Sequence, residues 1–253
     1  TTTTTTTTTS KGSSSVSSSH LFENKQDWKS LPLHPQLLAA VTDKQNSHFG
    51  HELQKPTNIQ SKFISSFFLP QNQTSNFLIH SETGSGKTLA YALPIIQTLA
   101  TTSAGANHNN KQNPTTTKTT SSSGEQPQPQ QQQLHRVNRK QAGTRCLILC
   151  PTRELAAQTT TVLETLCANS FGWLVCGSLL ASSSGGSDGQ KARKSEKARI
   201  RKGLSMIVAT PGRCLDHLTK TEALCLSLKG KIEFLVLDEA DRLLDMGLGE
   251  QVK

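Results

Sequence analysis

The stretch Ser81–Tyr91, with the sequence SETGSGKTLAY, constrains the fold of this chain more than any other segment. It follows an apolar run at 76–79 and precedes a helix-favouring run at 87–99, so the pattern predicts a strand, a glycine-rich loop and a helix. Gly84 and Gly86 permit a tight turn, and the N–H groups of the turn then lie at a helix N-terminus. This arrangement is typical of a phosphate-binding loop.

The residues that follow the glycines have the chemistry for a nucleoside triphosphate. Lys87 would place a cation on the outer phosphate groups, and Thr88 would offer a hydroxyl to Mg²⁺. The strict pattern asks for glycine at position 81, where this chain has Ser81. A glycine turn before an ordinary helix stays open for this segment alone. The candidate nucleotide-binding residues of the loop are Ser81, Glu82, Thr83, Gly84, Ser85, Gly86, Lys87 and Thr88.

A second motif, FLVLDEAD at 234–241, supplies carboxylates. Its four apolar residues predict a strand buried on both faces of a parallel sheet, with Asp238 where the strand ends. Ligands of open α/β sheets bind at that edge, so Asp238 is a candidate Mg²⁺ ligand and Glu239 a candidate to orient or deprotonate the attacking water. A solvated acidic turn is the alternative for this motif alone. Together, the two motifs predict a nucleotide hydrolase with Lys87, Asp238 and Glu239 as catalytic residues.

The remainder of the chain alternates predicted strands and helices, which is typical of a parallel sheet with helices on both faces. We expect further strands at 146–150, 173–176 and 206–209, and helices at 35–43, 57–69, 154–168, 190–202 and after Pro211. A chain of 253 residues can hold one such domain.

Two segments are too polar to belong to a core. Residues 1–24 are mostly Thr and Ser, and about 101–143 is rich in Thr, Gln, Asn and Ser. We expect both to be disordered, the second as an insertion in a surface loop.

Composition narrows the class of partner. The formal net charge of +9 favours a polyanion, although it also fits simple solubility. No apolar run approaches the about 18 residues of a membrane-spanning helix, so no membrane partner is expected. The six cysteines have no zinc-ligand spacing, and most lie in apolar runs, which predicts buried, reduced thiols.

Five ordered motifs resemble the first RecA-like domain of the DEAD-box RNA helicases: KPTNIQ at 55–60, SETGSGKT at 81–88, PTRELAAQ at 151–158, TPGR at 210–213 and DEAD at 238–241. The resemblance covers roughly residues 28–247 outside the low-complexity tracts. It implies an α/β, RecA-like P-loop domain over 25–253, an adenine-recognition segment at 28–60, and ATP with Mg²⁺ as ligands. It also implies a second RecA-like domain, absent from this chain, so we expect an N-terminal fragment that is nearly inactive alone.

The resemblance also implies roles for single residues. Gln60 would hydrogen-bond the adenine edge with Thr57 nearby, and Trp28 would stack on the ring, with a core indole as the alternative for Trp28. RNA phosphates would contact two strand-to-helix turns and a pair of adjacent glycines. Gly177 is an alternative candidate for this glycine contact. Pro at a helix start is also common for structural reasons, so TPGR alone is a weak signal of RNA binding. The candidate RNA-binding residues are Pro151, Thr152, Arg153, Gly185, Gly186, Thr210, Pro211, Gly212 and Arg213.

The run KARKSEKARIRKG at 191–203 is similar to the branch of the family that acts in assembly of the large ribosomal subunit. Its seven Lys or Arg residues beside Glu196 predict a basic helix, for which a solvated surface is the alternative. The implied function is an ATP-dependent RNA helicase of ribosome biogenesis, monomeric and located in the nucleus and nucleolus. It would bind pre-ribosomal RNA mainly through the phosphate backbone, with pre-ribosomal proteins as further partners. Two alternatives stay open: an ATP-gated RNA clamp with little unwinding, and a non-catalytic RNA-binding scaffold.

Overall fold

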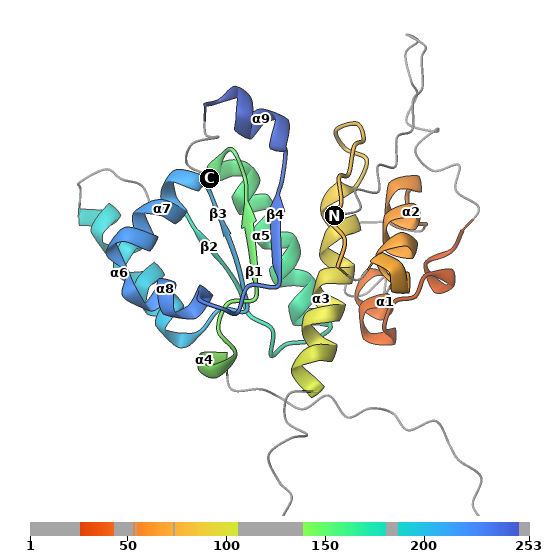
Figure 1. The fold of residues 1–253 in the computed structure, drawn as a ribbon, viewed down its shortest axis with the longest axis horizontal. Coiled ribbons are helices and arrows are strands. Elements are labelled where there is room, and N and C mark those ends of the chain that lie inside the picture. The colour runs from red at the N-terminus through yellow and green to blue at the C-terminus, as the bar shows by residue number, and fades with distance from the viewer. Residues whose placement is uncertain are drawn as a thin grey trace, which may run out of the picture.

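A parallel four-stranded sheet lies at the centre of the computed structural model, which describes residues 26–42, 53, 55–72, 74–105, 139–180 and 187–247. Helices cover both faces of the sheet (Figure 1). The predicted class, an α/β domain with a parallel sheet between helices, is therefore confirmed. The predicted tail at 1–24 and residues 106–138 of the predicted insertion lie outside the described residues.

The strands are β1 (Cys146–Leu149), β2 (Cys176–Leu179), β3 (Met206–Ala209) and β4 (Phe234–Leu237). They pair in the order β2-β3-β1-β4, with Leu147 of β1 opposite Ile207 of β3 and Leu235 of β4. The helices are α1 (Pro35–Thr42), α2 (Asn58–Phe67), α3 (Lys87–Gly105), α4 (Arg139–Ala142), α5 (Arg153–Asn169), α6 (Ser187–Lys202), α7 (Pro211–Lys220), α8 (Glu222–Leu228) and α9 (Ala240–Asp245). Short 3₁₀ helices, η2 (Trp28–Ser30) and η4 (Pro70–Asn72), complete the set.

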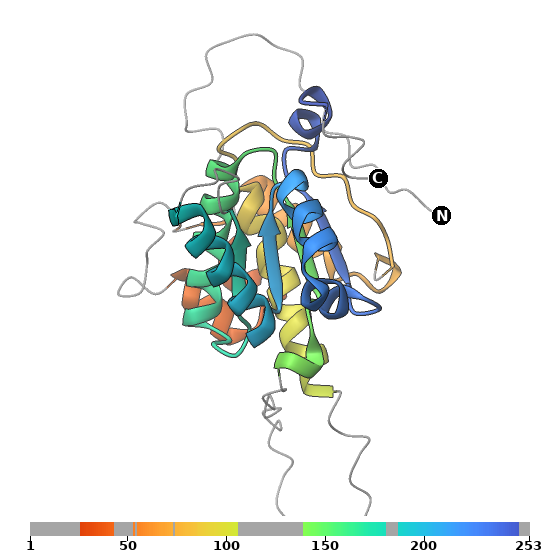
Figure 2. The ribbon, with the colours of Figure 1, turned by 90° about the vertical axis from the view of Figure 1, so that its left-hand side faces the viewer.

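Two apolar cores lie on opposite faces of the sheet because successive strand side chains point to opposite sides. Ile148 of β1 belongs to the larger core, with side chains from α1, α3 and α5. Its neighbour Leu149 belongs to the smaller core, with side chains from α6, α7 and α8. Figure 2 looks from the side of α6, α7 and α8 and has α1, α2 and α3 at the back. Apolar residues on both sides of β1 and β3 thus explain why both faces are covered.

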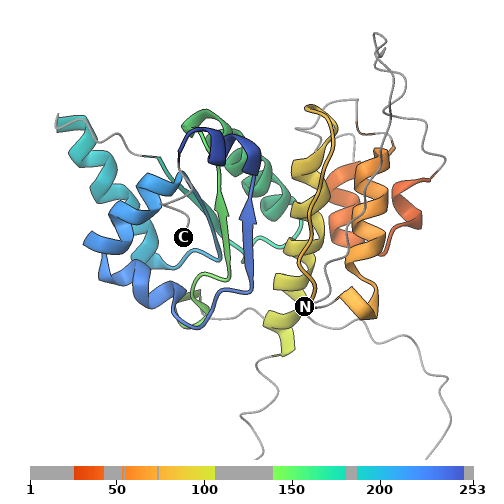
Figure 3. The same ribbon diagram turned by 45° about the horizontal axis from the view of Figure 1, so that its top comes forward.

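Residues 76–80, where a strand was predicted, have no regular secondary structure and do not belong to the sheet. Figure 3 shows this segment running beside α3. Phe77 stacks on Phe67 of α2 with ring centroids 5.7 Å apart, whereas Leu78 is 69% exposed. The apolar pattern therefore reflects a chain that is covered on one side, and the prediction of a paired strand is wrong for the described sheet.

The strand β4 has the predicted position, but its burial differs from the prediction. Phe234 and Val236 pack against the larger core, while Leu235 and Leu237 are 57% and 41% exposed. The prediction of burial on both faces is wrong because β4 is an edge strand, and the smaller core lies over β1, β2 and β3 instead.

Two further boundaries differ from the predictions. The strand β2 begins at Cys176, where the predicted strand at 173–176 was expected to end, because Trp173 instead packs beside Phe171 with ring centroids 5.3 Å apart. Helix α3 continues to Gly105, inside the range assigned to the low-complexity insertion. Thr102 in this last part accepts a hydrogen bond from the Arg145 guanidinium, so polar composition alone placed the start of the insertion too early.

Arg145 ties the end of α3 to the sheet. This residue directly precedes β1, and its Nη1 donates to the carbonyl oxygen of Leu99 in α3 at 2.7 Å. Its Nε and Nη2 donate to the two carboxylate oxygens of Glu233 at 2.5 and 2.8 Å, immediately before β4. The Arg145 side chain is only 9% exposed, so a paired carboxylate is needed to balance its buried charge. One cation thereby connects a helix and two adjacent strands.

Neither a membrane-spanning helix nor a metal-binding group occurs within the described ranges. No helix there is long and apolar enough to cross a bilayer. No group of three or more His, Cys, Asp or Glu side chains there is arranged to hold a metal ion.

The fold predicts a sharp difference in thiol reactivity. All six cysteines are free, and five are buried while Cys225 in α8 is exposed. Burial raises the pKa of Cys214 to about 11 and that of Cys150 to about 12, so these thiols are also poor nucleophiles at neutral pH. We expect Ellman's reagent to titrate Cys225 rapidly in the native chain and the other thiols only after unfolding in guanidinium. The variant Cys225→Ser should lose the rapid phase, and rapid reaction of a second thiol would contradict the two-core packing.

Candidate nucleotide and RNA site

The glycine-rich loop has the geometry that its sequence predicts. Gly84 and Gly86 have φ values of 76° and 86°, in the left-handed region that favours glycine. A Cβ at Gly86 would lie 2.3 Å from Nε2 of Gln60, whereas one at Gly84 would meet nothing within 4 Å. Ser81, at the position where the strict pattern has glycine, shares a 2.7 Å hydrogen bond with the hydroxyl of Ser85. The departure from the pattern therefore closes the loop with a side-chain contact.

Lys87 is the first residue of α3 and lies over the loop. Its ammonium group donates to the carbonyl oxygens of Ser81 and Glu82, both at 2.8 Å. The side chains of Lys87 and Thr88 are partly exposed, and Glu82, Thr83 and Gly84 are exposed. The loop and its cation are therefore accessible to a ligand, as a phosphate site requires.

Thr57 and Gln60 brace the loop from α2. Thr57 caps the helix, and its hydroxyl donates to the carbonyl oxygen of Ser85 at 2.9 Å. The Gln60 amide accepts from the N–H of Thr57 at 2.9 Å and donates to the carbonyl oxygen of Gly86 at 3.2 Å. Both residues are buried, so their contacts in this structure are with the protein. Their adenine contacts stay predictions, but their connection to the loop is direct.

Trp28 lies in the core rather than on a nucleotide surface. The residue is 0% exposed, and its indole N–H donates to the carbonyl oxygen of Leu53 at 2.9 Å. A ring without exposed surface cannot stack on adenine in this arrangement. This arrangement agrees with the alternative of a core indole, since Trp28 belongs to the larger apolar core, and stacking on adenine stays a prediction.

Asp238 lies where β4 ends, and Tyr91 of α3 holds it. The Tyr91 hydroxyl donates to Oδ2 of Asp238 at 2.8 Å, and the N–H of Glu239 donates to Oδ1 at 3.1 Å. Burial raises the pKa of the Asp238 carboxyl, and the Tyr91 hydrogen bond, the Glu239 N–H and the charge of Lys87 oppose that rise. Burial also raises the pKa of Tyr91 well above its usual value, so this phenol is a stable donor. Asp238 and the loop cation thus belong to one electrostatic site.

Glu239 has an unusual backbone conformation at this edge. With φ 48° and ψ 54°, it is the non-glycine residue with positive φ in the described part of the chain, and it precedes α9. A left-handed conformation costs on the order of 1 kcal/mol for a residue with a Cβ, and such conformations cluster at functional sites. Its carboxylate accepts from Arg242 at 2.7 Å and is partly exposed. The Glu239 side chain is therefore oriented and accessible.

The predicted RNA segments at 151–153 and 210–213 lie at the same edge of the sheet as Asp238. Leu149, the last residue of β1, is opposite the last residues of β3 and β4, and the chains continue from there into these segments. Thr152 caps α5 by accepting from the N–H of Leu155 at 3.2 Å, and Arg153 is exposed. Nucleotide and RNA candidates therefore meet at the carboxyl ends of parallel strands, where open α/β sheets bind ligands.

The glycine candidates divide between described and undescribed residues. Gly185 and Gly186 lie outside the described residues. Gly177 lies in β2, where an added Cβ would be 2.9 Å from Nη2 of Arg199 and from Cδ1 of Leu204. Close packing explains this glycine without any ligand.

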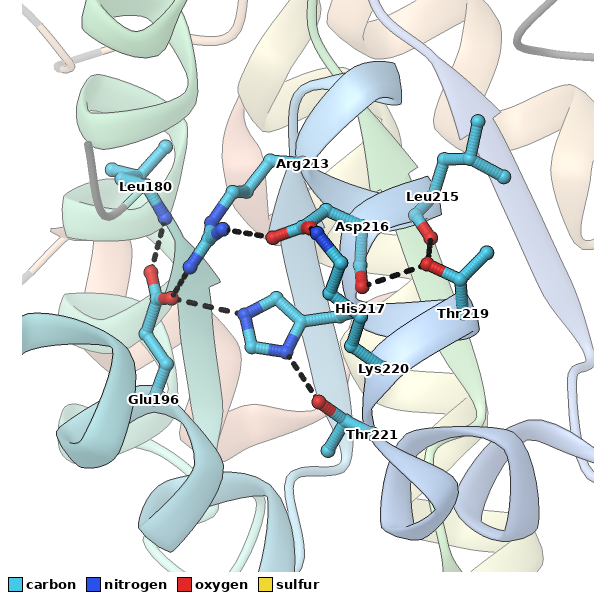
Figure 4. Close-up of polar contacts among 9 residues, drawn as sticks. All are labelled: Leu180, Glu196, Arg213, Leu215, Asp216, His217, Thr219, Lys220 and Thr221. Atoms are coloured by element: carbon cyan, nitrogen blue, oxygen red, sulfur yellow. Dashed lines mark hydrogen bonds and ion pairs between the residues drawn. The ribbon is translucent and has the colours of Figure 1, made fainter. Parts of the chain in front are cut away.

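Arg213 differs from the other candidates because its guanidinium is buried. Nη2 donates to Glu196 of α6 at 2.6 Å, and Nη1 pairs with Asp216 (Figure 4). Its side chain is 5% exposed. Gly212 beside it is exposed, so the backbone of the turn remains accessible. Contact of the 210–213 turn with RNA stays a prediction, but in this arrangement the Arg213 charge is directed into the protein.

The sequence profile described as DEAD/DEAH box helicase matches residues 57–253, which is more than half of the chain. This chain belongs to the DEAD/DEAH box helicase family. Among curated relatives, the ATP-dependent RNA helicase dbp7 of Aspergillus oryzae is 36% identical over 239 residues, covering 94% of this chain and 26% of that protein. The probable ATP-dependent RNA helicase CG8611 of Drosophila melanogaster is 36% identical over 224 residues, covering 88% of this chain and 17% of that protein. The chain therefore spans about a quarter or less of the length of these relatives.

Solved DEAD-box structures have the same fold. The yeast DEAD-box splicing factor Prp28 matches with a TM-score of 0.60 and 25% identity, covering 87% of this chain and 39% of that chain. A DEAD box protein from Methanococcus jannaschii matches with a TM-score of 0.55 and 26% identity, covering 89% and 45% of the two chains. These matches confirm the RecA-like fold class of this DEAD-box domain.

Two residues of the site were assigned no contact partner from the sequence. Tyr91 lies in the quoted loop motif, four residues after Lys87 and so on the same face of α3, but the sequence could not indicate which strand it meets. Glu196 is one acidic residue in a basic run, and a polar helix normally predicts solvent exposure. The available signal for a buried role of Glu196 was its position as an isolated acidic residue among cations.

The loop geometry predicts that Lys87→Ala weakens nucleotide binding without unfolding the domain. The change removes a cation from the accessible side of the loop, and charged contacts to phosphate are strong, so the affinity for an ATP analogue should fall by at least about tenfold. Isothermal titration measures the affinity, and circular dichroism checks the fold. Lys62→Ala, which removes an exposed cation from α2, is the matched control and should bind like the parent. Equal affinities of parent and Lys87→Ala would contradict the site.

The contact between Tyr91 and Asp238 predicts a narrower effect for Tyr91→Phe. Loss of the hydroxyl leaves the ring but removes a donor from the buried carboxylate, so Asp238 should be held less well for a metal ion. We expect about a tenfold loss of affinity for an ATP analogue in Mg²⁺ and little change in EDTA. Titrations in both buffers separate the two cases. An equal loss in EDTA would mean that Tyr91 acts on the loop and not through Asp238.

Proposed function

We propose that this domain binds ATP with Mg²⁺ and couples ATP hydrolysis to RNA binding and remodelling, as part of an ATP-dependent RNA helicase. The observation that carries the proposal is the hydrogen bond between Tyr91 and Asp238. It connects the helix that begins with Lys87 to the carboxylate at the end of β4. A phosphate-binding cation and a metal-binding carboxylate are thereby held in one site, which is the requirement for phosphoryl transfer.

The residues present fit a magnesium nucleotide. Gly84 leaves open space where a side chain would otherwise stand, and the loop amides and Lys87 can take the phosphate groups. Asp238 and Thr88 offer hard oxygen ligands, the type that Mg²⁺ prefers. When bound, Mg²⁺ neutralises charge on the outer phosphate groups. Tyr91 and the N–H of Glu239 donate to the two oxygens of the Asp238 carboxyl and so orient it for that ion.

Glu239 is suited to act on water. Its carboxylate is partly exposed next to Asp238, and Arg242 restricts its orientation through the 2.7 Å ion pair. An oriented carboxylate can accept a proton from an attacking water or align that water with the outer phosphate. This role explains why an unfavourable left-handed backbone is retained at this residue.

The RNA part of the proposal rests on the same edge of the sheet. Arg153 is exposed at the start of α5, and the turn at 210–213 opens α7. Helix N-termini bind phosphate oxygens through backbone N–H groups, and such contacts carry little sequence preference. We therefore propose that the domain binds the RNA backbone next to the nucleotide site, so that each ligand can affect the other.

We further propose that the RNA is pre-ribosomal and that the protein acts in the nucleolus. The basic run at 191–203, its similarity to the large-subunit branch of the family, and the matches to relatives named dbp7 support this finer statement. An exposed cationic helix also suits a polyanionic environment. Pre-ribosomal proteins are the proposed further partners.

The test of the proposed function uses Glu239→Gln in the full-length protein that contains this domain. The change keeps the size of the side chain but removes the base, so RNA-stimulated ATP turnover should fall by a factor of about 10² to 10⁴. Binding of RNA in the presence of ATP should persist. Phosphate release and filter binding measure the two quantities, and Asp245→Asn at the exposed end of α9 is the matched control.

Unchanged turnover in Glu239→Gln would contradict its catalytic role. Absence of any turnover in the parent would favour the scaffold alternative. Strand displacement separates the remaining two: ATP-dependent retention of RNA without strand separation would identify a clamp, and separation would identify a helicase.

A further inference from the structure

Glu196 is a buried carboxylate within the most basic helix of the domain. Helix α6 carries seven Lys or Arg residues between 191 and 202, yet Glu196 is only 7% exposed. Burial of an ionised carboxylate is expensive unless several donors meet it. Its position between α6, α7 and the end of β2 is therefore a specific feature of the fold rather than a consequence of helix composition.

Groups from two segments, the residue after β2 and helix α7, converge on this carboxylate (Figure 4). Oε1 accepts from the N–H of Leu180, immediately after β2, at 2.6 Å. Oε2 accepts from Nη2 of Arg213 at 2.6 Å and lies 3.0 Å from Nε2 of His217. Arg213 is in the first turn of α7, and His217 is one turn further on. Glu196 therefore fixes the direction of the first two turns of α7 and connects them to the chain after β2.

Further polar contacts surround this cluster, and Arg213 remains buried among them. The second face of the guanidinium pairs with Asp216, which also pairs with Lys220, and the ring of His217 lies 3.1 Å from the hydroxyl of Thr221. Arg213 and His217 are 6% and 2% exposed. Because Arg213 is paired with two carboxylates inside the protein, a phosphate would have to break a buried ion pair to use its side chain.

We propose that Glu196 is a positioning residue for RNA binding: its carboxylate orients α7, through Arg213, so that the backbone of the 210–213 turn meets RNA phosphates. The inference rests on the proposed function. It assigns Arg213 an internal role and leaves the RNA contact to the exposed backbone at Gly212. A carboxylate near RNA repels phosphate, so the charge of Glu196 alone would weaken RNA binding. The proposal instead gives Glu196 a role that supports RNA binding.

The test uses a variant for which simple electrostatics and the proposal predict opposite changes in RNA affinity. Glu196→Gln makes the chain more positive by one charge, which by simple electrostatics strengthens RNA binding. The proposal predicts the reverse: affinity for fluorescein-labelled single-stranded oligouridylate should fall by about tenfold, corresponding to about 1.4 kcal/mol. Affinity for a magnesium ATP analogue should stay within about twofold of the parent, because the loop and Asp238 are contacted by other residues. Fluorescence anisotropy of the 253-residue chain measures both ligands.

Glu164→Gln is the matched control. Glu164 of α5 pairs with Arg199 of the same basic helix at 3.1 Å, but both side chains are largely accessible, at 49% and 40% exposed. The change in net charge is identical, so this variant should bind RNA as well as the parent or slightly better. A difference between Glu196→Gln and Glu164→Gln therefore reports position and not charge.

A rescue variant separates positioning from simple loss of stability. Glu196→Gln leaves the Arg213 cation buried without its partner, whereas the double variant Glu196→Gln/Arg213→Gln replaces the ion pair by two neutral amides that can hydrogen-bond each other. The proposal predicts that the double variant recovers RNA affinity to within about threefold of the parent, and it also carries the test if the single variant does not fold. If Arg213 itself binds phosphate, the double variant should remain weak.

The outcomes are distinguishable. Unchanged or tighter RNA binding by Glu196→Gln, or failure of the double variant to recover while it still binds the ATP analogue, would overturn the positioning role alone. RNA binding by the parent that is no stronger than that of an unrelated basic protein would overturn the proposed RNA function, and the inference with it.

Discussion

Helix α3 carries the phosphate-binding lysine, and two polar contacts hold it against the sheet. Near its start, Tyr91 donates to the buried carboxylate of Asp238 at the end of β4. Near its end, the carbonyl oxygen of Leu99 accepts from Arg145 before β1. Polar groups that are buried must find partners, so each contact is costly to break. These two contacts set where Lys87 lies relative to Asp238, and the chemistry of the site depends on that relation.

The parts of this structure that follow from local pattern were predictable from the sequence. Runs such as CLIL and MIVA are apolar on both sides, which demands helices on both faces, and the glycines at 84 and 86 allow one type of turn. The order of motifs also indicated the candidate residues around Lys87 and Asp238. Thr57 illustrates the limit: the sequence placed it next to the adenine candidate Gln60, but its contact with the loop carbonyl of Ser85 depends on tertiary structure.

The differences between the sequence patterns and the observed contacts have a common physical origin, since a sequence pattern describes the character of a side chain and not its neighbours. Trp28 has an aromatic ring suited to adenine, but a ring of that size is equally suited to a core, and the core contains it. Arg213 follows a phosphate-binding pattern, but Glu196 lies 17 residues away in sequence and neutralises it. The run at 76–79 is apolar like a strand, although two aromatic rings of α2, Phe63 and Phe67, contact Phe77 in place of a pairing strand. Each outcome was decided by a long-range partner.

The outer side of β4 has a consequence for how the chain behaves in solution. No strand of the described sheet pairs with that side, and Leu235 and Leu237 stand exposed along it. An open edge with apolar neighbours is a template on which another molecule can add a strand, so self-association through β4 competes with the dispersed state as protein concentration rises. The net charge of +9 opposes this by mutual repulsion, which salt screens. Ionic strength should therefore influence how far this exposed edge promotes association.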